Sequence, residues 1–108
     1  MPKVRYYSKK RRAIYAMGEQ FTHLEIFERD NWMCGLCHTE VSRARRHPDL
    51  LCATLDHIVP LAEALELGWE PETIHTRKNV QTAHLYCNLA KSGHLPSAVQ
   101  FAMPAQMV

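Results

Sequence analysis

The stretch that decides the fold is residues 78–93, which read KNVQTAHLYCNLAKSG. The segment from Val80 to Ala83 carries apolar and β-branched residues and predicts a short strand. From His84 to Ser92 the pattern is typical of a helix, and Gly93 stands just past its end, where glycine commonly closes a helix. We therefore expect a strand that leads directly into a helix.

Two residues of this stretch, His84 and Cys87, have the spacing of a metal-binding pair. Positions i and i+3 share one face of a first helical turn, so the imidazole and the thiolate can converge. Upstream, Cys34 and Cys37 are separated by two residues, the usual spacing of zinc-binding thiolates in a tight turn. Together the two pairs make a closed Cys₃His set, which predicts a structural zinc site.

Two alternatives compete with this interpretation of the cysteines. Cys34 and Cys37 alone also fit a thioredoxin-like redox pair. A redox pair should open a helix after a strand, whereas here a helix is expected before the pair and a polar loop after it. Cys52 is a competing fourth ligand, but its place in an apolar segment favours a small buried residue. In a reducing compartment cysteines are expected as metal ligands or buried thiols rather than disulfides.

The rest of the chain predicts an α+β fold. Residues Leu50 to Val59 are apolar and predict a strand that Pro60 ends. A short helix is expected from Ala62 to Leu67, closed by Gly68. Apolar residues at helical intervals predict a longer helix from Ile14 to Asp30, ahead of the cysteine pair.

The bulk composition limits the class of protein. A chain of 108 residues with 46% hydrophobic residues suits one globular domain with a modest core. No apolar run approaches the roughly 20 residues that span a bilayer, and the charged N-terminus lacks the apolar region of a secretory signal. We expect a cytoplasmic protein without a membrane association.

The positive charge is segregated although the net charge is only +2. Six cations and no acid occupy the first twelve residues: Lys3, Arg5, Lys9, Lys10, Arg11 and Arg12. Such clusters attract phosphate backbones without reading base sequence. A solvated, partly disordered basic arm is the simpler alternative.

Polar residues that suit catalysis lie between and beside the zinc pairs. Asp56 and His57 interrupt an apolar strand, where they are costly to bury unless they bind something; a core histidine with a neighbouring acid is the structural alternative. Asn79 stands just before the second strand. Asn88 directly follows Cys87 and is turned from it by about 100° on a helix.

Three runs of the chain, taken in order, resemble the zinc-containing His-Asn-His (HNH) endonucleases of bacteria and phages. They are residues 29–37 (RDNWMCGLC), 55–61 (LDHIVPL) and 78–93, and the resemblance covers about residues 20–93. It implies a small ββα-metal fold, a hairpin packed on a helix, here with an added N-terminal helix. The implied domains are a basic arm at 1–19, the nuclease domain at 20–95 and a tail at 96–108. Residues 61–78 depart from the family, which often has a short turn there.

The resemblance also implies a role for each matched residue. His57 resembles the general base that takes a proton from water, and Asn79 resembles the residue that orients His57 and braces the hairpin. Asp56 and Asn88 resemble the ligands of one divalent cation, Mg²⁺ or alternatively Mn²⁺ or Ni²⁺. The structural zinc positions are matched by Cys34, Cys37, His84 and Cys87.

The activity implied is hydrolysis of DNA phosphodiester bonds, double-stranded DNA above all, in the cytoplasm of a bacterium or a phage-infected host cell. The expected ends are a 5′-phosphate and a 3′-hydroxyl. Lys91, Arg77 and Lys78 are candidates for phosphate contacts, although solvated surface charges explain them equally well. A noncatalytic zinc module that binds nucleic acid or protein is the alternative. The sequence leaves open whether a monomer or a homodimer acts.

Overall fold

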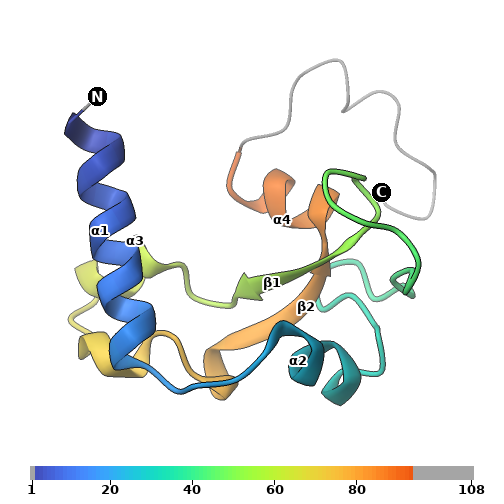
Figure 1. Cartoon of the computed structure of the whole chain (residues 1–108), viewed down its shortest axis with the longest axis horizontal. Helices are drawn as coiled ribbons and strands as arrows, with labels where there is room; N and C mark the ends of the chain where they lie inside the picture. Colours follow the sequence, from blue (N-terminus) through green and yellow to red (C-terminus); the bar gives the residue numbers. More distant parts are fainter. Residues whose placement is uncertain (1, 94–108) are drawn as a thin grey trace. The chain divides into compact units, whose positions relative to one another are not determined.

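The computed structural model describes residues 2–93, with side chains from residue 9 onward. The predicted tail at residues 96–108 lies outside this range. The described chain is α+β, and its elements follow one another along the sequence (Figure 1). They are α1 (Pro2–Met17), α2 (His23–Arg29), β1 (Ala53–His57), α3 (Leu61–Glu66), η1 (Pro71–Thr73), η2 (Arg77–Asn79), β2 (Val80–His84) and α4 (Leu85–Lys91).

Strands β1 and β2 form a two-stranded sheet. At one end the Ile58 N–H donates to the Asn79 carbonyl over 2.8 Å, and at the other the Leu85 N–H donates to the Cys52 carbonyl over 2.9 Å. Rising residue numbers on one strand therefore pair with falling numbers on the other, so the strands are antiparallel. Helix α4 follows β2 without a loop (Figure 1), which confirms the predicted hairpin followed by a helix.

The chain folds as two compact units. Residues 2–22 and 57–80 make the first unit, and residues 23–56 and 81–93 make the second. The buried centre of the first unit consists of Ile14, Ala64 and Ile74. The buried centre of the second consists of Cys34, Val41, Ala83 and Cys87. Half of this second centre is cysteine, so a metal bound there would add to a small core.

The predicted single helix from Ile14 to Asp30 is wrong. Two helices, α1 and α2, occupy this region, and the segment predicted as a basic arm is helical within α1. The reason lies at Gly18, where an added Cβ would stand 2.9 Å from the His75 Cβ and against the His75 carbonyl oxygen. A close approach of this kind admits only glycine, and the chain leaves the helix there. The domain boundaries at residues 19 and 95 stay predictions.

Helix α2 is joined to β2 inside the second unit by Asp30. The carboxylate of Asp30 accepts hydrogen bonds from the Thr82 backbone N–H at 2.9 Å and from the Thr82 hydroxyl at 3.0 Å. Burial raises the pKa of Asp30, but the bonds from Arg29 and Thr82 outweigh burial and hold this pKa below its usual value. These bonds place the end of α2, and therefore the cysteine turn that follows it, beside β2.

The shorter helices agree with the sequence pattern. Helix α3 lies within one residue of the predicted span from Ala62 to Leu67. Gly68 and Gly93 follow α3 and α4 with φ of 85° and 76°, a conformation that favours glycine. Within residues 2–93, no helix has both the length and the apolar character needed to cross a bilayer.

Candidate metal centre and active site

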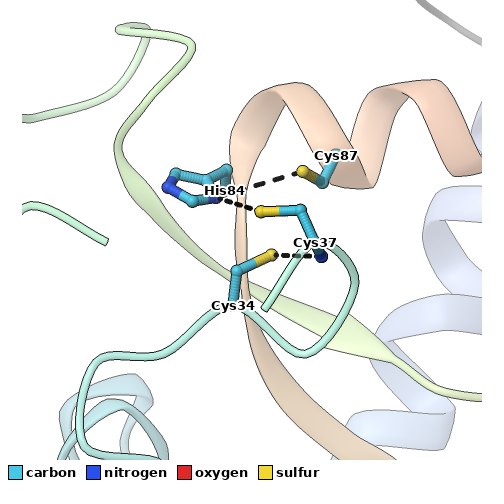
Figure 2. A group of neighbouring side chains, drawn as sticks. All are labelled: Cys34, Cys37, His84 and Cys87. Atoms are coloured by element: carbon cyan, nitrogen blue, oxygen red, sulfur yellow. Dashed lines mark hydrogen bonds between the residues drawn. The ribbon is translucent and has the colours of Figure 1, made fainter. Parts of the chain in front are cut away.

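The four predicted zinc ligands converge in the second unit (Figure 2). One ligand atom from each residue lies within 4.8 Å of all the others; the residues are Cys34, Cys37, His84 and Cys87. Thiolates bound to tetrahedral zinc stand roughly 3.8 Å apart, because each bond is about 2.3 Å long. The spacing and the soft donor set therefore fit a structural zinc ion. Cys52, the competing ligand, is buried outside this cluster.

Hydrogen bonds in and after the turn between Cys34 and Cys37 favour the metal-binding form of their sulfurs. The Cys34 Sγ accepts the backbone N–H groups of Leu36 and Cys37, both at 3.4 Å. The Cys37 Sγ lies 3.0 Å from the Thr39 hydroxyl. Burial raises the pKa of Cys37, but hydrogen bonds from Thr39 and Cys34 outweigh burial and lower it overall. Bonds to sulfur favour the thiolate, which is the form that binds zinc.

The imidazole of His84 is oriented by both of its ring nitrogens. Its Nδ1 faces the sulfurs of Cys37 and Cys87 at 3.4 and 3.9 Å (Figure 2). Its Nε2 lies 3.1 Å from the Glu40 carbonyl oxygen. Donation from Nε2–H to that carbonyl leaves the Nδ1 lone pair for a metal, the usual arrangement around zinc-binding histidines. Burial lowers the pKa of His84, which favours the neutral, ligating form.

Asp56 is buried, with 3% of its surface exposed, and its carboxylate is held by two side chains. Lys91 Nζ lies 3.1 Å from Oδ1 and 3.0 Å from Oδ2. The Gln81 amide donates to Oδ2 at 2.9 Å. Lys91, predicted to contact phosphate, thus forms an ion pair with the predicted cation ligand. Gln81 was missed, and the only sequence signal for it was a polar residue in a buried strand.

Asn88 fastens α4 to β1 next to this acid. Its Nδ2 donates to the Thr54 hydroxyl at 3.2 Å and to the Leu55 carbonyl at 3.3 Å. The amide oxygen Oδ1 is therefore on the side of the amide group opposite to the one that faces Thr54 and Leu55. Asp56 and Asn88 offer a carboxylate and an amide oxygen, which are the hard donors that Mg²⁺ and similar ions prefer.

His57 lies in the first unit, at the end of β1. Its Nε2 is 3.0 Å from Nδ1 of His75, and the two ring centroids are 5.2 Å apart. The Tyr15 ring stacks on His75 at 4.2 Å and on His57 at 5.6 Å. The pairing of His75 with His57 was not predicted from the sequence. The hydrogen bond between His75 and His57 joins positions 18 residues apart, so no local sequence pattern indicates it.

Asn79 is 5% exposed and bonds to backbone on two segments of the first unit. Its Oδ1 accepts the Val59 N–H at 3.0 Å, while Nδ2 donates to the Val59 carbonyl at 3.0 Å and to the Ile74 carbonyl at 2.9 Å. These contacts brace the chain just after His57. These three side-chain hydrogen bonds of Asn79 go to backbone atoms, whereas the ring of His57 contacts His75.

The remaining candidates for phosphate contacts differ from each other. Arg77 donates from Nη1 to a Glu19 carboxylate oxygen at 3.0 Å and from Nη2 to the Gln20 carbonyl at 3.2 Å. Its guanidinium also lies 5.5 Å from the Phe21 ring centre. Arg77 therefore fastens the segment after α1, while Lys78 is exposed.

Helix α4 joins the two kinds of chemistry in the second unit. Cys87 belongs to the Cys₃His cluster, and the next residue, Asn88, contacts β1 one residue before Asp56. The Cys₃His cluster is therefore one peptide bond from a residue whose amide contacts β1 next to Asp56. Comparison with protein-family models, with curated proteins and with solved structures gave no match.

Proposed function

We propose that this chain is a metal-dependent endonuclease that hydrolyses phosphodiester bonds in DNA. The observation that carries the proposal is the position of α4. The first turn of α4 bears Cys87 of the Cys₃His cluster. The next residue, Asn88, contacts Leu55 of β1. Lys91, further along α4, contacts Asp56. A metal at the cluster would hold this geometry, because it ties α4 to the cysteine turn.

Asp56 and Asn88 are the residues that would hold the second metal, a divalent cation. When bound, such a cation neutralises the negative charge that develops on the phosphate and on the leaving oxygen. Lys91 contacts both carboxylate oxygens of Asp56, so a bound cation would share or displace this ammonium group. Two protein ligands also leave the remaining coordination positions for water and substrate.

His57 directly follows Asp56 in β1 and acts as the general base. Histidine suits this role because its ordinary pKa of about 6.5 keeps the neutral form available near neutral pH. His57 takes a proton from water as the water oxygen bonds to phosphorus. The bond from phosphorus to the 3′-oxygen breaks, and that oxygen takes up a proton. The products are a 5′-phosphate and a 3′-hydroxyl.

One observation favours a second function, a noncatalytic zinc module that binds nucleic acid or protein. The carboxylate of Asp56 is satisfied by Lys91 and Gln81, so an ion pair within the fold is sufficient to explain its burial. This function needs the Cys₃His cluster but has no use for a general base. Cleavage of DNA therefore separates the two functions.

The test is an assay of the zinc-loaded full chain on supercoiled, linear and branched DNA with Mg²⁺, Mn²⁺ or Ni²⁺. We expect cleavage that requires the added cation and stops with a chelator, and nicks that a DNA ligase reseals, because ligases need a 5′-phosphate beside a 3′-hydroxyl. Asp56→Asn should lose cleavage, whereas Asp49→Asn, in an exposed ion pair with Arg45, should cleave normally. Binding of DNA without cleavage under all these conditions would favour the noncatalytic module.

A further inference from the structure

The ring of His75 is held rigidly next to His57 in the first unit. His75 is 8% exposed, and its imidazole lies between the rings of Tyr15 and Phe21, with centroid distances of 4.2 and 4.7 Å and interplanar angles of 20° and 22°. Its backbone carbonyl accepts the Glu19 N–H at 2.9 Å. A ring stacked on both faces and anchored at its backbone has a fixed plane, and in that plane Nδ1 lies 3.0 Å from Nε2 of His57.

Asn79 fixes the distance between the two histidine segments. Its Nδ2 donates both to the Val59 carbonyl, two residues after His57, and to the Ile74 carbonyl, one residue before His75. The backbones that carry the two rings are therefore joined through one buried amide. The 3.0 Å contact between the imidazoles therefore follows from the fold of this unit and not from an accidental contact between surface side chains.

The contact has a consequence for the chemistry of His57. A neutral imidazole carries hydrogen on one nitrogen and a lone pair on the other. Because Nε2 of His57 faces His75, the nitrogen of His57 that accepts a proton from water must be Nδ1. Nδ1 accepts a proton only when the ring hydrogen sits on Nε2, and that hydrogen needs an acceptor, which Nδ1 of His75 provides.

We propose that His75 is a positioning residue that holds His57 in the Nε2–H tautomer and so presents its Nδ1 lone pair to water. His75 then carries its own hydrogen on Nε2. When His57 gains a proton at Nδ1, the bond from its Nε2–H to His75 becomes charge-assisted and stronger. Both the choice of tautomer and its effect on catalysis rest on the proposed endonuclease function, because the 3.0 Å contact between the rings admits either imidazole as the donor.

Two substitutions separate the hydrogen bond from the packing. His75→Phe keeps a ring between Tyr15 and Phe21 but removes the acceptor. His75→Asn removes the ring but keeps a polar group near the position of Nδ1. His23→Phe is the matched control, because His23 is an exposed histidine of α2 whose ring lies 6.2 Å from that of Phe27.

The first measurement reads the tautomer from ring nitrogen chemical shifts of the zinc-loaded full chain, at a pH where His57 is neutral. We expect the Nε2–H form of His57 in the parent, in His75→Asn and in His23→Phe, and a mixture of tautomers in His75→Phe. The Nδ1–H form in the parent, or an unchanged tautomer in His75→Phe, would overturn the proposal. The parent spectrum alone decides this point if His75→Phe does not fold.

The second measurement is the rate of DNA cleavage. In His75→Phe we expect kcat to fall by about 10–100-fold, the usual effect of removing a residue that orients a functional histidine, with KM nearly unchanged. His75→Asn should recover most of this loss. A parental kcat in folded His75→Phe, or no recovery in His75→Asn, would overturn the positioning role. A parent that cleaves no DNA but shows the Nε2–H tautomer would refute the endonuclease function and leave the histidine pair intact.

Discussion

Lys91 Nζ lies 3.1 and 3.0 Å from the two carboxylate oxygens of Asp56, so one ammonium group bridges both oxygens of a buried acid. A divalent cation at Asp56 would approach the same oxygens. If Asp56 binds the proposed cation, Lys91 and the cation would therefore compete for one carboxylate. Lys91 gives the buried carboxylate a charged partner and holds it in place, since an isolated charge is costly to bury.

Replacing Lys91 should strengthen cation binding and weaken the fold. In Lys91→Met we expect the affinity for Mn²⁺ to rise about tenfold, a typical coupling between two sites. The free energy of unfolding without cation should fall by about 1–3 kcal/mol, because a buried carboxylate loses a charged partner. Calorimetric titration with Mn²⁺ and urea unfolding measure the two effects. Lys78→Met, which changes an exposed lysine, is the control, and equal Mn²⁺ affinity in both variants would show that Lys91 does not compete.

The cysteines should differ in their effect on zinc. Cys87→Ser removes one of the four converging ligands, so we expect loss of bound zinc and of several kcal/mol of stability. Cys52→Ala removes a buried thiol outside the cluster, so one zinc per chain should remain. Zinc content and thermal melting check both variants. A Cys87→Ser protein that keeps its zinc and melts like the parent would exclude this site.

The metal-free fold should weaken in acid because of His84. Burial lowers the pKa of His84 in the fold below the value of about 6.5 expected in the unfolded chain. The unfolded chain therefore binds more protons, so the stability from neutral His84 is present above about pH 6.5 and is lost as pH falls through the folded pKa. Urea unfolding at about pH 7.5 and about pH 5.5 measures the loss, which should shrink in His84→Gln. If His84→Gln loses as much stability in acid as the parent, groups other than His84 cause the loss.

Gly18→Ala tests the close approach that ends α1. The added Cβ would meet backbone atoms of His75, which cannot rotate away. We expect a loss of about 2 kcal/mol or more, together with a shift of the His75 ring signals. Gly68→Ala serves for comparison, since Gly68 has φ of 85° and open space around it, and strain alone costs about 1 kcal/mol there. Equal losses in the two variants would show that the contact with His75 has no cost.

The metal cluster and the end of the described chain could be predicted from sequence because their signals are local. Cys34 with Cys37, and His84 with Cys87, each show ligand spacing within four residues. The glycine after α4 marks the helix end. These short patterns are sufficient to place β2 and α4, since each depends on neighbours in the chain.

The rest depends on contacts between distant positions. The break between α1 and α2 follows from Gly18 packing against His75, which no helical pattern reveals. The partners of the two catalytic candidates are equally non-local: His75 lies 18 residues from His57, and Lys91 lies 35 residues from Asp56. Residue spacing therefore identified the candidates but not the side chains that hold them.

The role of His57 is tested most directly by the rate at which His57→Ala nicks supercoiled DNA, compared with the parent and with His23→Ala as a matched control. Removing a general base typically lowers the rate by about 10²–10⁴-fold. We predict a loss of this size in His57→Ala, with zinc content and melting temperature kept, and parental nicking in His23→Ala. A folded, zinc-loaded His57→Ala protein that nicks at the parental rate would contradict the proposed mechanism.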